Sequence, residues 1–570
     1  MYSKPLILEK QKTPSNVPNQ KARIAVVLVT TMVVIAVSMR FILIMNNWPV
    51  TNSDESIMGL MALHISHGGE WPLMYYGQGY MGPIEAYIAA PFFRLLGPSV
   101  FSLRIGLLLF FSLFLIAMYR YSKFLYTEKF ALFICLLLCL ESKEIIIRQL
   151  KAIGGYPELP LLAVTICILV TAILWRHNKT ITNKARASQY LLYFLLGLMA
   201  SFAIWTDLLI FPFVMMGLFL LIIFIRKDLL SLAGLLLLCG FVIGIFPIIL
   251  HNITAPFSES TIANMAGLIN ATDGKSYSLL QKLGGAFFIG IPSATGYPQM
   301  CPSNMAPTLG EIQAGCLLLR GSWSLGYLVL WTLAVWSAIK NIRRESGKEI
   351  ATTREARQKQ IIEYSRLMLL VGGGLTIIIY SPSTSAASAP EPTARYLICL
   401  LLTIPAVLWQ LWPGKSSYLK NKATKAPGII FYLHLCLLAT ILCAFSYGII
   451  ETFTDIPAAQ QFSRQETRLA QHLESIQATR IYSEYWTCNR LIFQSEEKII
   501  CSVLNPDLTP GMNRYSPYQV AVQKTQSPSY VFPLNSQHEH NFIKIHKQDN
   551  TLQNYQYSTY EGYSIYLSKG

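Results

Sequence analysis

Two adjacent carboxylates, Asp54 and Glu55, stand in the stretch NSDESIMGL, a few residues after an apolar run that can cross a bilayer. Ser53 or Asp54 can cap a helix here, because acids and hydroxyls satisfy the free N–H groups of a first turn. Adjacent acids also raise each other's pKa, which suits a general base. Since a cap also fixes a carboxylate in place, we treat the pair both as helix caps and as the first candidates for a catalytic centre.

Basic residues stand near the ends of several apolar runs, all at the face that the loop charges described below predict to be the outer one. They are Arg40, Arg104, Arg148, Lys151 and Arg395. A single long basic side chain at a membrane boundary can simply extend to the interface. Several on one face, together with an acid pair, instead favour an anionic ligand such as a lipid phosphate.

Other chemistry-bearing residues follow the acid pair. His64 and His67, three residues apart, could share a helix face and bind a metal, or could be polar residues of the interface. Glu85 begins an apolar helical stretch, either as a cap or as a site residue. The motif GQGYMG at 77–82 neither follows an apolar strand nor opens a Rossmann helix, so its glycines indicate a backbone turn or close approach to a ligand.

The composition indicates the elements that must position these residues. Of 570 residues, 53% are hydrophobic and 13% are charged, against about 25% charged in soluble domains. About eleven apolar runs are long enough to span a membrane, or nearly so. They lie near 24–46, 103–121, 129–147, 157–175, 189–206, 208–225, 229–250, 322–340, 363–381, 396–412 and 428–450.

The placement of charge predicts the orientation in the membrane. The net charge is +16, but the basic residues lie in short segments between apolar runs, so we expect no nucleic-acid partner. The basic tail 1–23 and the loop WRHNKTITNKAR are predicted to be cytoplasmic, whereas residues 46–93 contain no Lys or Arg and are predicted to lie outside. We therefore expect a multi-pass protein of the cytoplasmic membrane, in contact with membrane lipids, with its N-terminus inside.

Three predicted outer regions are too long to be connectors: 46–100, 251–321 and the tail 452–570. In the first, IMGLMALHISHGGEW and PIEAYIAAPFFRLLG have helical apolar spacing and are expected to lie at the interface as amphipathic helices. The tail combines the helical SRQETRLAQHLESIQ with short β-like runs, RIYSEYW, KIICSVL, SYVFPL and GYSIYLS. The expected fold is mainly α and polytopic, with a transmembrane domain over 24–451 and a small extracytoplasmic α/β domain over 452–570.

The tail and the second outer region also hold cysteines outside the apolar runs. The pairs Cys301–Cys316 and Cys488–Cys501 are candidate disulfides, provided that their compartment is oxidising. Near the second pair, Trp486 and Arg490 in EYWTCNRLIF are candidate sugar contacts, although a tryptophan in such a stretch can equally be part of a core.

The first outer region resembles a known family. SDESIMGLMALHISHGGEWP, followed by YYGQGYMGPIEAYIAAPFFRLLGPSVFSLRIG, is similar to the first external loop of GT-C membrane glycosyltransferases. The similarity is to the bacterial branch related to protein O-mannosyltransferases, aminoarabinose transferases and rhizobial lipopolysaccharide-core sugar transferases. Arg40 before the acid pair also matches this branch. Further on, GGYPELPLL, IWTDLLIFP, TARYLICLLLTIPA and YSEYWTCNRLIFQSEEKII resemble its later segments.

The resemblance implies inverting transfer of a sugar from a polyprenyl-phosphate donor to a lipid, glycan or protein acceptor outside the cytoplasmic membrane. Asp54 would act as base or orient the acceptor hydroxyl, assisted by Glu55 and Glu85. Four cations would hold the donor phosphate: Arg40, Arg104, Lys151 and Arg395. The substrate-binding candidates are Gln78, Tyr80, Tyr156 and Glu158. Some relatives use a divalent cation and others do not, which leaves that cofactor open.

Two other functional classes compete with this reading. A lipid or sugar transporter could also use arginines within the membrane, but transporters place charges and broken helices near the midplane, whereas here the charges gather at the outer face. A non-catalytic envelope-assembly protein would have no need of both Asp54 and Glu55.

Overall fold

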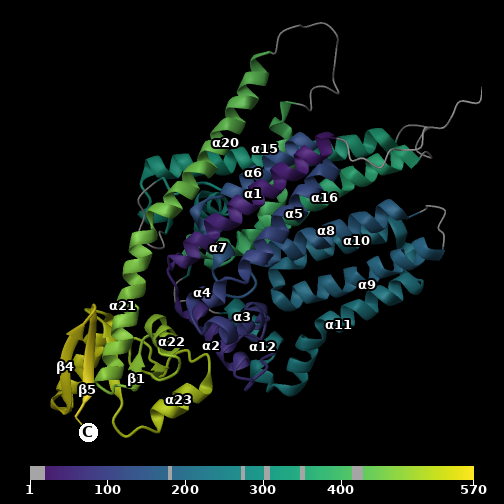
Figure 1. Cartoon of the computed structure of the whole chain (residues 1–570). Helices are drawn as coiled ribbons and strands as arrows, with labels where there is room; N and C mark the ends of the chain where they lie inside the picture. The colour runs from purple at the N-terminus through teal and green to yellow at the C-terminus, as the bar shows by residue number, and fades with distance from the viewer. Residues whose placement is uncertain are drawn as a thin grey trace, which may run out of the picture.

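The protein is a helical bundle with a small sheet domain at one end (Figure 1). The computed structural model describes residues 20–177, 183–270, 276–300, 308–346, 354–413 and 428–569. Within these ranges, ten helical stretches are long and apolar enough to cross a membrane. The prediction of a mainly α, polytopic membrane protein is therefore confirmed.

Most of these stretches are continuous helices: α1 (Gln20–Met45), α5 (Leu107–Leu125), α8 (Leu159–Arg176), α9 (Asn183–Thr206), α10 (Phe211–Leu229), α11 (Leu232–Thr254), α15 (Ala314–Ser346), α16 (Arg354–Tyr380) and α20 (Ile429–Thr454). The stretch Pro390–Leu411 instead joins short turns: α18 (Pro390–Thr393), η6 (Ala394–Thr403), α19 (Ile404–Leu408) and η7 (Trp409–Leu411).

Apolar side chains cover the outside of this bundle as well as its core. Val34, Ile243 and Leu333 are exposed, although they lie well inside α1, α11 and α15. In water such a surface would be costly, at about 25 cal/mol per Å² of apolar area. Lipid tails are as apolar as these side chains, so the pattern is that of a membrane-embedded bundle.

The run 129–147, expected as one span, is broken. It forms α6 (Glu128–Leu140) and α7 (Lys143–Leu150), and neither helix reaches spanning length alone. The break falls at Glu141, whose φ of 59° is left-handed and ends α6. The pair still returns the chain from the end of α5 to the opposite end of the bundle, because Ala152, just after α7, donates its N–H to Glu55. With this broken passage the chain traverses the bundle about eleven times, as expected.

The outer region 46–100 forms α2 (Ser53–Ser66), α3 (Ile84–Leu96) and α4 (Val100–Arg104). α3 exposes Leu95 and Leu96, in agreement with an amphipathic helix at the interface. The same expectation for α2 is wrong, since all but Asp54 and His64 of its residues are buried. The C-terminal part of the chain covers the side of α2 that would otherwise meet water or lipid. For this reason α2 can be apolar on nearly every face.

Shorter elements join the long helices of the bundle. They are η1 (Leu208–Ile210), η2 (Phe257–Glu259), α12 (Thr261–Asn270), α13 (Leu279–Gly285), the π-helical η3 (Ala286–Gly290), α14 (Ile291–Thr295), η4 (Leu309–Glu311) and α17 (Ser385–Ser388).

The C-terminal part is a mixed sheet with helices around it. The strands are β1 (Arg480–Ser483), β2 (Ile500–Val503), β3 (Ser529–Pro533), β4 (Tyr555–Tyr560) and β5 (Tyr563–Ser568), in the order β2-β1-β3-β5-β4. β1 runs parallel to β2 and β3, and β5 runs antiparallel to β3 and β4. The helices are α21 (Ile456–Ser475), α22 (Tyr485–Gln494), α23 (Ser516–Gln523) and α24 (Gln537–Gln548), with η9 (Leu552–Asn554) before β4.

The β-like runs of the sequence correspond to β1, β2, β3 and β5, whereas β4 was not foreseen. Its central residues are all exposed, so it is an edge strand without the apolar alternation that marks a half-buried one.

This domain packs directly on the outer region through α22. Ile57 and Leu60 of α2 share one apolar core with Leu491 and Phe493 of α22 (Figure 1). A side chain at Gly59 would meet the Phe493 ring at 2.6 Å, so the two helices require glycine at this crossing. The first outer region and the chain's last hundred residues therefore form one structural unit.

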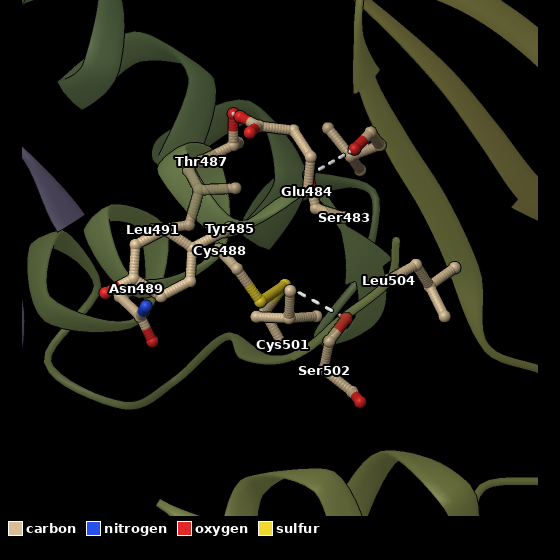
Figure 2. The surroundings of a disulfide bond; sticks show 12 residues. Ser483, Glu484, Tyr485, Thr487, Cys488, Asn489, Leu491, Cys501, Ser502 and Leu504 are labelled. Carbon is tan, nitrogen blue, oxygen red and sulfur yellow. Dashed lines mark hydrogen bonds between the residues drawn. A yellow bond between two sulfur atoms is a disulfide. The ribbon is translucent and has the colours of Figure 1, made fainter. Parts of the chain in front are cut away.

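A disulfide holds α22 against the sheet. Cys488 of α22 and Cys501 of β2 are bonded, and Figure 2 shows Tyr485 and Asn489 on the same helix beside this bond. This disulfide prediction is confirmed. The other predicted pair involves Cys301, which lies outside the described residues, as does most of the predicted cytoplasmic tail.

Candidate functional site

Asp54 lies at the start of α2, at the junction between the bundle and the C-terminal domain. Asn52 caps the helix by accepting from the Glu55 N–H, which fixes the first turn. The Oδ1 atom of Asp54 accepts hydrogen bonds from the Tyr485 hydroxyl at 2.6 Å and from Arg514 Nη2 at 3.2 Å. Its side chain is 15% exposed, and within the described part of the chain Oδ2 has no hydrogen-bond partner. One oxygen is thus held while the other is free to bind.

Glu55, the next residue, has the opposite environment. Both its oxygens accept from Arg104, at 2.7 and 2.6 Å, and both side chains are fully buried. Oε1 also accepts the Ala152 N–H at 3.3 Å. This two-point ion pair joins α2 to α4 and to the segment after α7. Glu55 therefore fixes the geometry of the first turn, whereas Arg104 Nη1 is buried without a partner in the described structure, so the phosphate contact of Arg104 stays a prediction.

Arg514 and Tyr485 come from the C-terminal domain and complete the surroundings of Asp54. Arg514 Nε donates to the Tyr485 hydroxyl at 2.9 Å, and its guanidinium also lies over the Tyr75 ring. Burial and the Asp54 carboxylate raise the pKa of Tyr485, so this phenol remains a hydrogen-bond donor. Sequence reasoning missed both residues, because they reach Asp54 only through the packing of α22 on α2.

Gln78 and Tyr80 join the same network from the loop between α2 and α3. With its amide oriented to satisfy both groups, the Gln78 oxygen accepts from Arg514 Nη1 and Nη2 at 2.7 and 3.0 Å and from the Tyr80 hydroxyl at 3.2 Å. Gly77 allows this approach, since its φ of 67° is left-handed and a side chain there would press on Arg514. The loop motif therefore turns the backbone, as the sequence predicted.

Two predicted phosphate-binding cations, Lys151 and Arg395, lie close to the acid pair. Burial lowers the pKa of Lys151 to about 8, an effect that the charges of Glu55 and Asp54 oppose and those of Arg104 and Arg395 increase. No hydrogen bond within the described chain holds the Lys151 amine. Arg395 stacks between the Tyr156 and Tyr396 rings, at 5.3 and 5.5 Å. These cations are available to an anion beside Asp54.

A second group of acids lies deeper in the same region. Glu85 Oε1 accepts the N–H groups of Gly154 and Gly155 at 2.9 and 3.0 Å, whereas its Oε2 and both oxygens of Glu158 are buried without a partner in the described structure. Burial raises the pKa of Glu85 to about 7 and that of Asp207 to about 7, and it raises that of Glu158 as well.

Buried acceptors without partners are costly, by about 1–3 kcal/mol each. These oxygens are therefore suited to accept hydrogen bonds from a hydroxyl-rich ligand. Asp207 was not among the sequence candidates, although a lone acid between two apolar runs in IWTDLLIFP was a signal that could have indicated it.

Arg40 and Arg148 are enclosed by protein instead. Arg40 is fully buried, bonds Glu141 at 2.9 Å and the Cys139 carbonyl at 2.9 Å, and lies 3.9 Å from the centre of the Phe111 ring. Arg148 donates to the carbonyl oxygens of Ser293 and Glu391. We expect both to brace helices. For Arg40 this departs from the predicted phosphate contact, because a sequence does not reveal that a buried arginine already has a carboxylate partner.

Of the remaining candidates, His64 and Arg490 have partners within the protein, whereas Trp486 is exposed. His64 bonds the Tyr76 hydroxyl at 2.8 Å and Glu497 at 3.0 Å. Among the residues described, no group of three or more His, Cys, Asp and Glu side chains lies together, and His64 and His67 belong to no such group. Arg490 is buried and paired with Glu466 at 2.9 Å. By contrast, Trp486 is 53% exposed, next to Tyr485.

An apolar groove of 790 Å³ opens on the side of the bundle between α15, α19 and α20. Tyr297, Trp323 and Leu408 are among its lining residues. Its outer end includes Thr295, two residues after the Ser293 carbonyl that accepts from Arg148. The apolar walls suit a long hydrocarbon chain, and this end of the groove lies near Arg148, whose charge in turn interacts with that of Arg395.

Comparison with known proteins identifies the fold. No family model matches the sequence, and no curated protein matches it. Among solved structures, ArnT from Cupriavidus metallidurans bound to undecaprenyl phosphate aligns with a TM-score of 0.55 and 12% identity, over 94% of this chain and 97% of that one. Apo ArnT aligns with a TM-score of 0.54 and 13% identity, over 95% and 98%.

The archaeal oligosaccharyltransferase AglB from Archaeoglobus fulgidus, in complex with an inhibitory peptide and a dolichol-phosphate, aligns with a TM-score of 0.51 and 12% identity, over 96% of this chain and 74% of that one. Both proteins are GT-C membrane glycosyltransferases. The resemblance seen in the first outer loop is thus confirmed at the level of architecture: this chain has the GT-C fold.

Proposed function

We propose that this protein is a glycosyltransferase that moves a sugar from a polyprenyl-phosphate-linked donor to an acceptor on the outer face of the cytoplasmic membrane, with inversion at the transferred carbon. One observation carries the proposal. Asp54 has one held and one free carboxylate oxygen, and it lies among Arg514, Lys151 and Arg395 at one end of a GT-C bundle. The solved relatives, which bind undecaprenyl phosphate or a dolichol-phosphate, support the same class of donor.

The free oxygen of Asp54 is the base in this proposal. It accepts the proton of the acceptor hydroxyl, whose oxygen attacks the anomeric carbon as the bond from that carbon to the phosphate oxygen breaks. Attack from the side opposite the leaving phosphate inverts the configuration. Tyr485 and Arg514 hold Oδ1, which aims Oδ2 at the acceptor hydroxyl.

The leaving polyprenyl phosphate gains negative charge during this step. Lys151 and Arg395 are the cations that would stabilise it, since neither is used up by an ion pair among the described residues. Charge stabilisation of this kind, in a site shielded from water, is usually a large part of catalysis. The groove next to α15 and α20 would hold the polyprenyl chain, because its walls are apolar and its lining includes Thr295, two residues from the Ser293 carbonyl that accepts from Arg148.

The donor sugar would lie over the buried acids. The unpartnered oxygens of Glu85 and Glu158 can accept from sugar hydroxyls, and Gln78, Tyr80 and Tyr156 would line the opening. The exposed Trp486 offers an apolar ring face beside Asp54 for an acceptor that carries sugars. The basic loops between the opposite ends of the helices support a cytoplasmic N-terminus and an extracytoplasmic C-terminal domain.

Replacement of Asp54 by Asn tests the proposal. Purified protein in lipid vesicles is supplied with polyprenyl-phosphate sugars extracted from the native membrane, and labelled sugar is followed into acceptor lipids, glycans and proteins. We expect wild-type transfer and a loss of about a thousandfold in Asp54→Asn, the usual range for a general base. Asp507→Asn, at an exposed turn of the C-terminal domain, is the control. Full transfer by Asp54→Asn would exclude this mechanism, and sugar crossing the vesicle without transfer would indicate a transporter.

A further inference from the structure

A second groove lies on another side of the bundle and has no part in the proposed reaction. It has a volume of 680 Å³ and lies between α5 and α8, with Met199 of α9 at its edge. Its walls are apolar, formed by residues such as Ile116, Leu161 and Ile168. Its three hydroxyls are all bonded: Tyr121 to Thr171, Thr171 also to Ser365, and Thr165 to the Leu161 carbonyl, so none is left unsatisfied for a ligand.

One end of this groove is basic. Arg120 and Arg176 both line it, and both are exposed. Arg176 donates to the Ser188 hydroxyl at 2.9 Å, and in the described part of the chain no carboxylate pairs with either arginine. Beside them, the rings of Phe124 and Trp175 meet edge to face at 4.9 Å. The groove therefore has an apolar body and a cationic end with free donors.

The basic end lies opposite the candidate active site. α4, which precedes α5, ends with the Arg104 that bonds Glu55, and α8 begins just after Glu158. Arg176 is in the last turn of α8, and Arg120 lies five residues before the end of α5, both toward the other end of the bundle. A donor lipid whose phosphate lies beside Lys151 would place its head at the wrong end to contact them.

The length of the groove matches an extended lipid chain. The lining of α8 runs from Leu161 to Arg176, fifteen residues further along the helix, which is about 22 Å at 1.5 Å per residue. Half of a bilayer's hydrocarbon core is about 15 Å thick. A chain anchored by its head at the arginines would thus reach through its own leaflet and stay within the groove.

We propose that this groove binds an anionic phospholipid from the leaflet opposite the active site, with one acyl chain between α5 and α8 and its phosphate between Arg120 and Arg176. Charge complementarity selects this occupant: two unpaired guanidinium groups at the end of an apolar channel recognise a phosphate attached to a hydrocarbon chain. Tryptophan beside the charged end is typical of a group that lies at headgroup depth.

The alternative is that the arginines only follow the general excess of basic residues at the cytoplasmic ends of spans. A matched pair of variants separates the two. Arg120→Gln with Arg176→Gln removes two cations from the groove. Lys129→Gln with Arg226→Gln removes two exposed cations that do not line it, from the ends of neighbouring helices.

The measurement is native mass spectrometry of the full-length protein, with phosphatidylglycerol or phosphatidylcholine added at equal concentration. Wild type is expected to retain phosphatidylglycerol preferentially. Because each basic group near an anionic headgroup contributes a preference of about fivefold, the groove pair should lower retention by about twenty-five-fold and the control pair by far less. Ala117→Phe, which fills the groove without changing charge, should lower retention of both lipids.

Equal losses in the two double variants, or unchanged retention in Ala117→Phe, would overturn the proposal. Displacement of phosphatidylglycerol from the groove by polyprenyl phosphate would also overturn it, because the occupant would then be the carrier lipid. The outcome is independent of the sugar-transfer assay, so a failure here leaves the proposed function untouched.

Discussion

Asp54 and Glu55 are neighbours in the chain and opposites in the structure. Glu55 is fully buried and both of its oxygens are paired with Arg104, so its charge holds helices together. Asp54 is partly exposed and shares only one oxygen, with groups that arrive from the C-terminal domain. The difference shows that in an acid pair at a helix start, one member can fix the geometry while the other remains chemically available.

The largest expected effects come from replacing Asp54, which should lower the rate of transfer, and Glu55, which should lower the stability of the fold. Asp54→Asn is expected to lower kcat by about a thousandfold with little change in thermal unfolding. Glu55→Gln leaves the Arg104 charge buried and without its carboxylate, which costs about 3–5 kcal/mol. Thermal unfolding in detergent, beside the transfer assay, checks both.

A double variant is the control for the Glu55 prediction. Glu55→Leu with Arg104→Met removes both buried charges and should recover much of the lost stability. A double variant as unstable as Glu55→Gln would show that the pair contributes more than the cost of an uncompensated charge.

Loss of the disulfide should affect the C-terminal domain, which supplies the hydrogen-bond partners of Asp54, and leave the helical bundle unchanged. Cys488→Ala with Cys501→Ala opens a loop with a sequence separation of 13, and closure of a loop of this size is worth about 3 kcal/mol. Because α22 carries Tyr485, we expect earlier unfolding of the C-terminal domain and reduced transfer, while the bundle unfolds as before. Limited proteolysis followed by mass spectrometry distinguishes the two parts, and simultaneous unfolding of both would contradict this prediction.

Arg514→Gln should reduce kcat by about tenfold to a hundredfold, the value of a charge-assisted hydrogen bond. The matched control is Arg468→Gln, which removes an exposed ion pair with Glu561 from the same domain. If both variants have the same activity, Arg514 does not hold Asp54 during the reaction.

The smallest effect concerns pH. Because the pKa of Lys151 is lowered to about 8, its ammonium is lost as the pH rises through that value, so the KM for the donor should increase above about pH 8. Lys151→Arg keeps its charge at higher pH, so the rise in KM should begin at a higher pH in this variant. If KM still rises above about pH 8 in Lys151→Arg, the rise is due to the titration of another group.

The sequence predicted the bundle well because long apolar runs and basic loops carry the topology locally. It also identified Asp54, Lys151 and Arg395 as residues that the fold brings near one another. It did not reveal which arginines are already paired, since the partner of Arg40 is Glu141, 101 residues away. Nor did it indicate Tyr485 and Arg514, 431 and 460 residues from Asp54. Local pattern carries no information about such long-range packing.

The crossing of α2 and α22 has a consequence for biosynthesis. α2 is made early, whereas the helix that covers it leaves the ribosome more than 400 residues later. Chains emerge N-terminus first, at about 5–20 residues per second, so α2 waits tens of seconds with its apolar face around Gly59 uncovered. During that interval Asp54 lacks Tyr485 and Arg514. The surroundings of Asp54 are therefore completed only near the end of translation, and a prematurely terminated chain would expose the apolar face of α2 and lack the groups that hold this carboxylate.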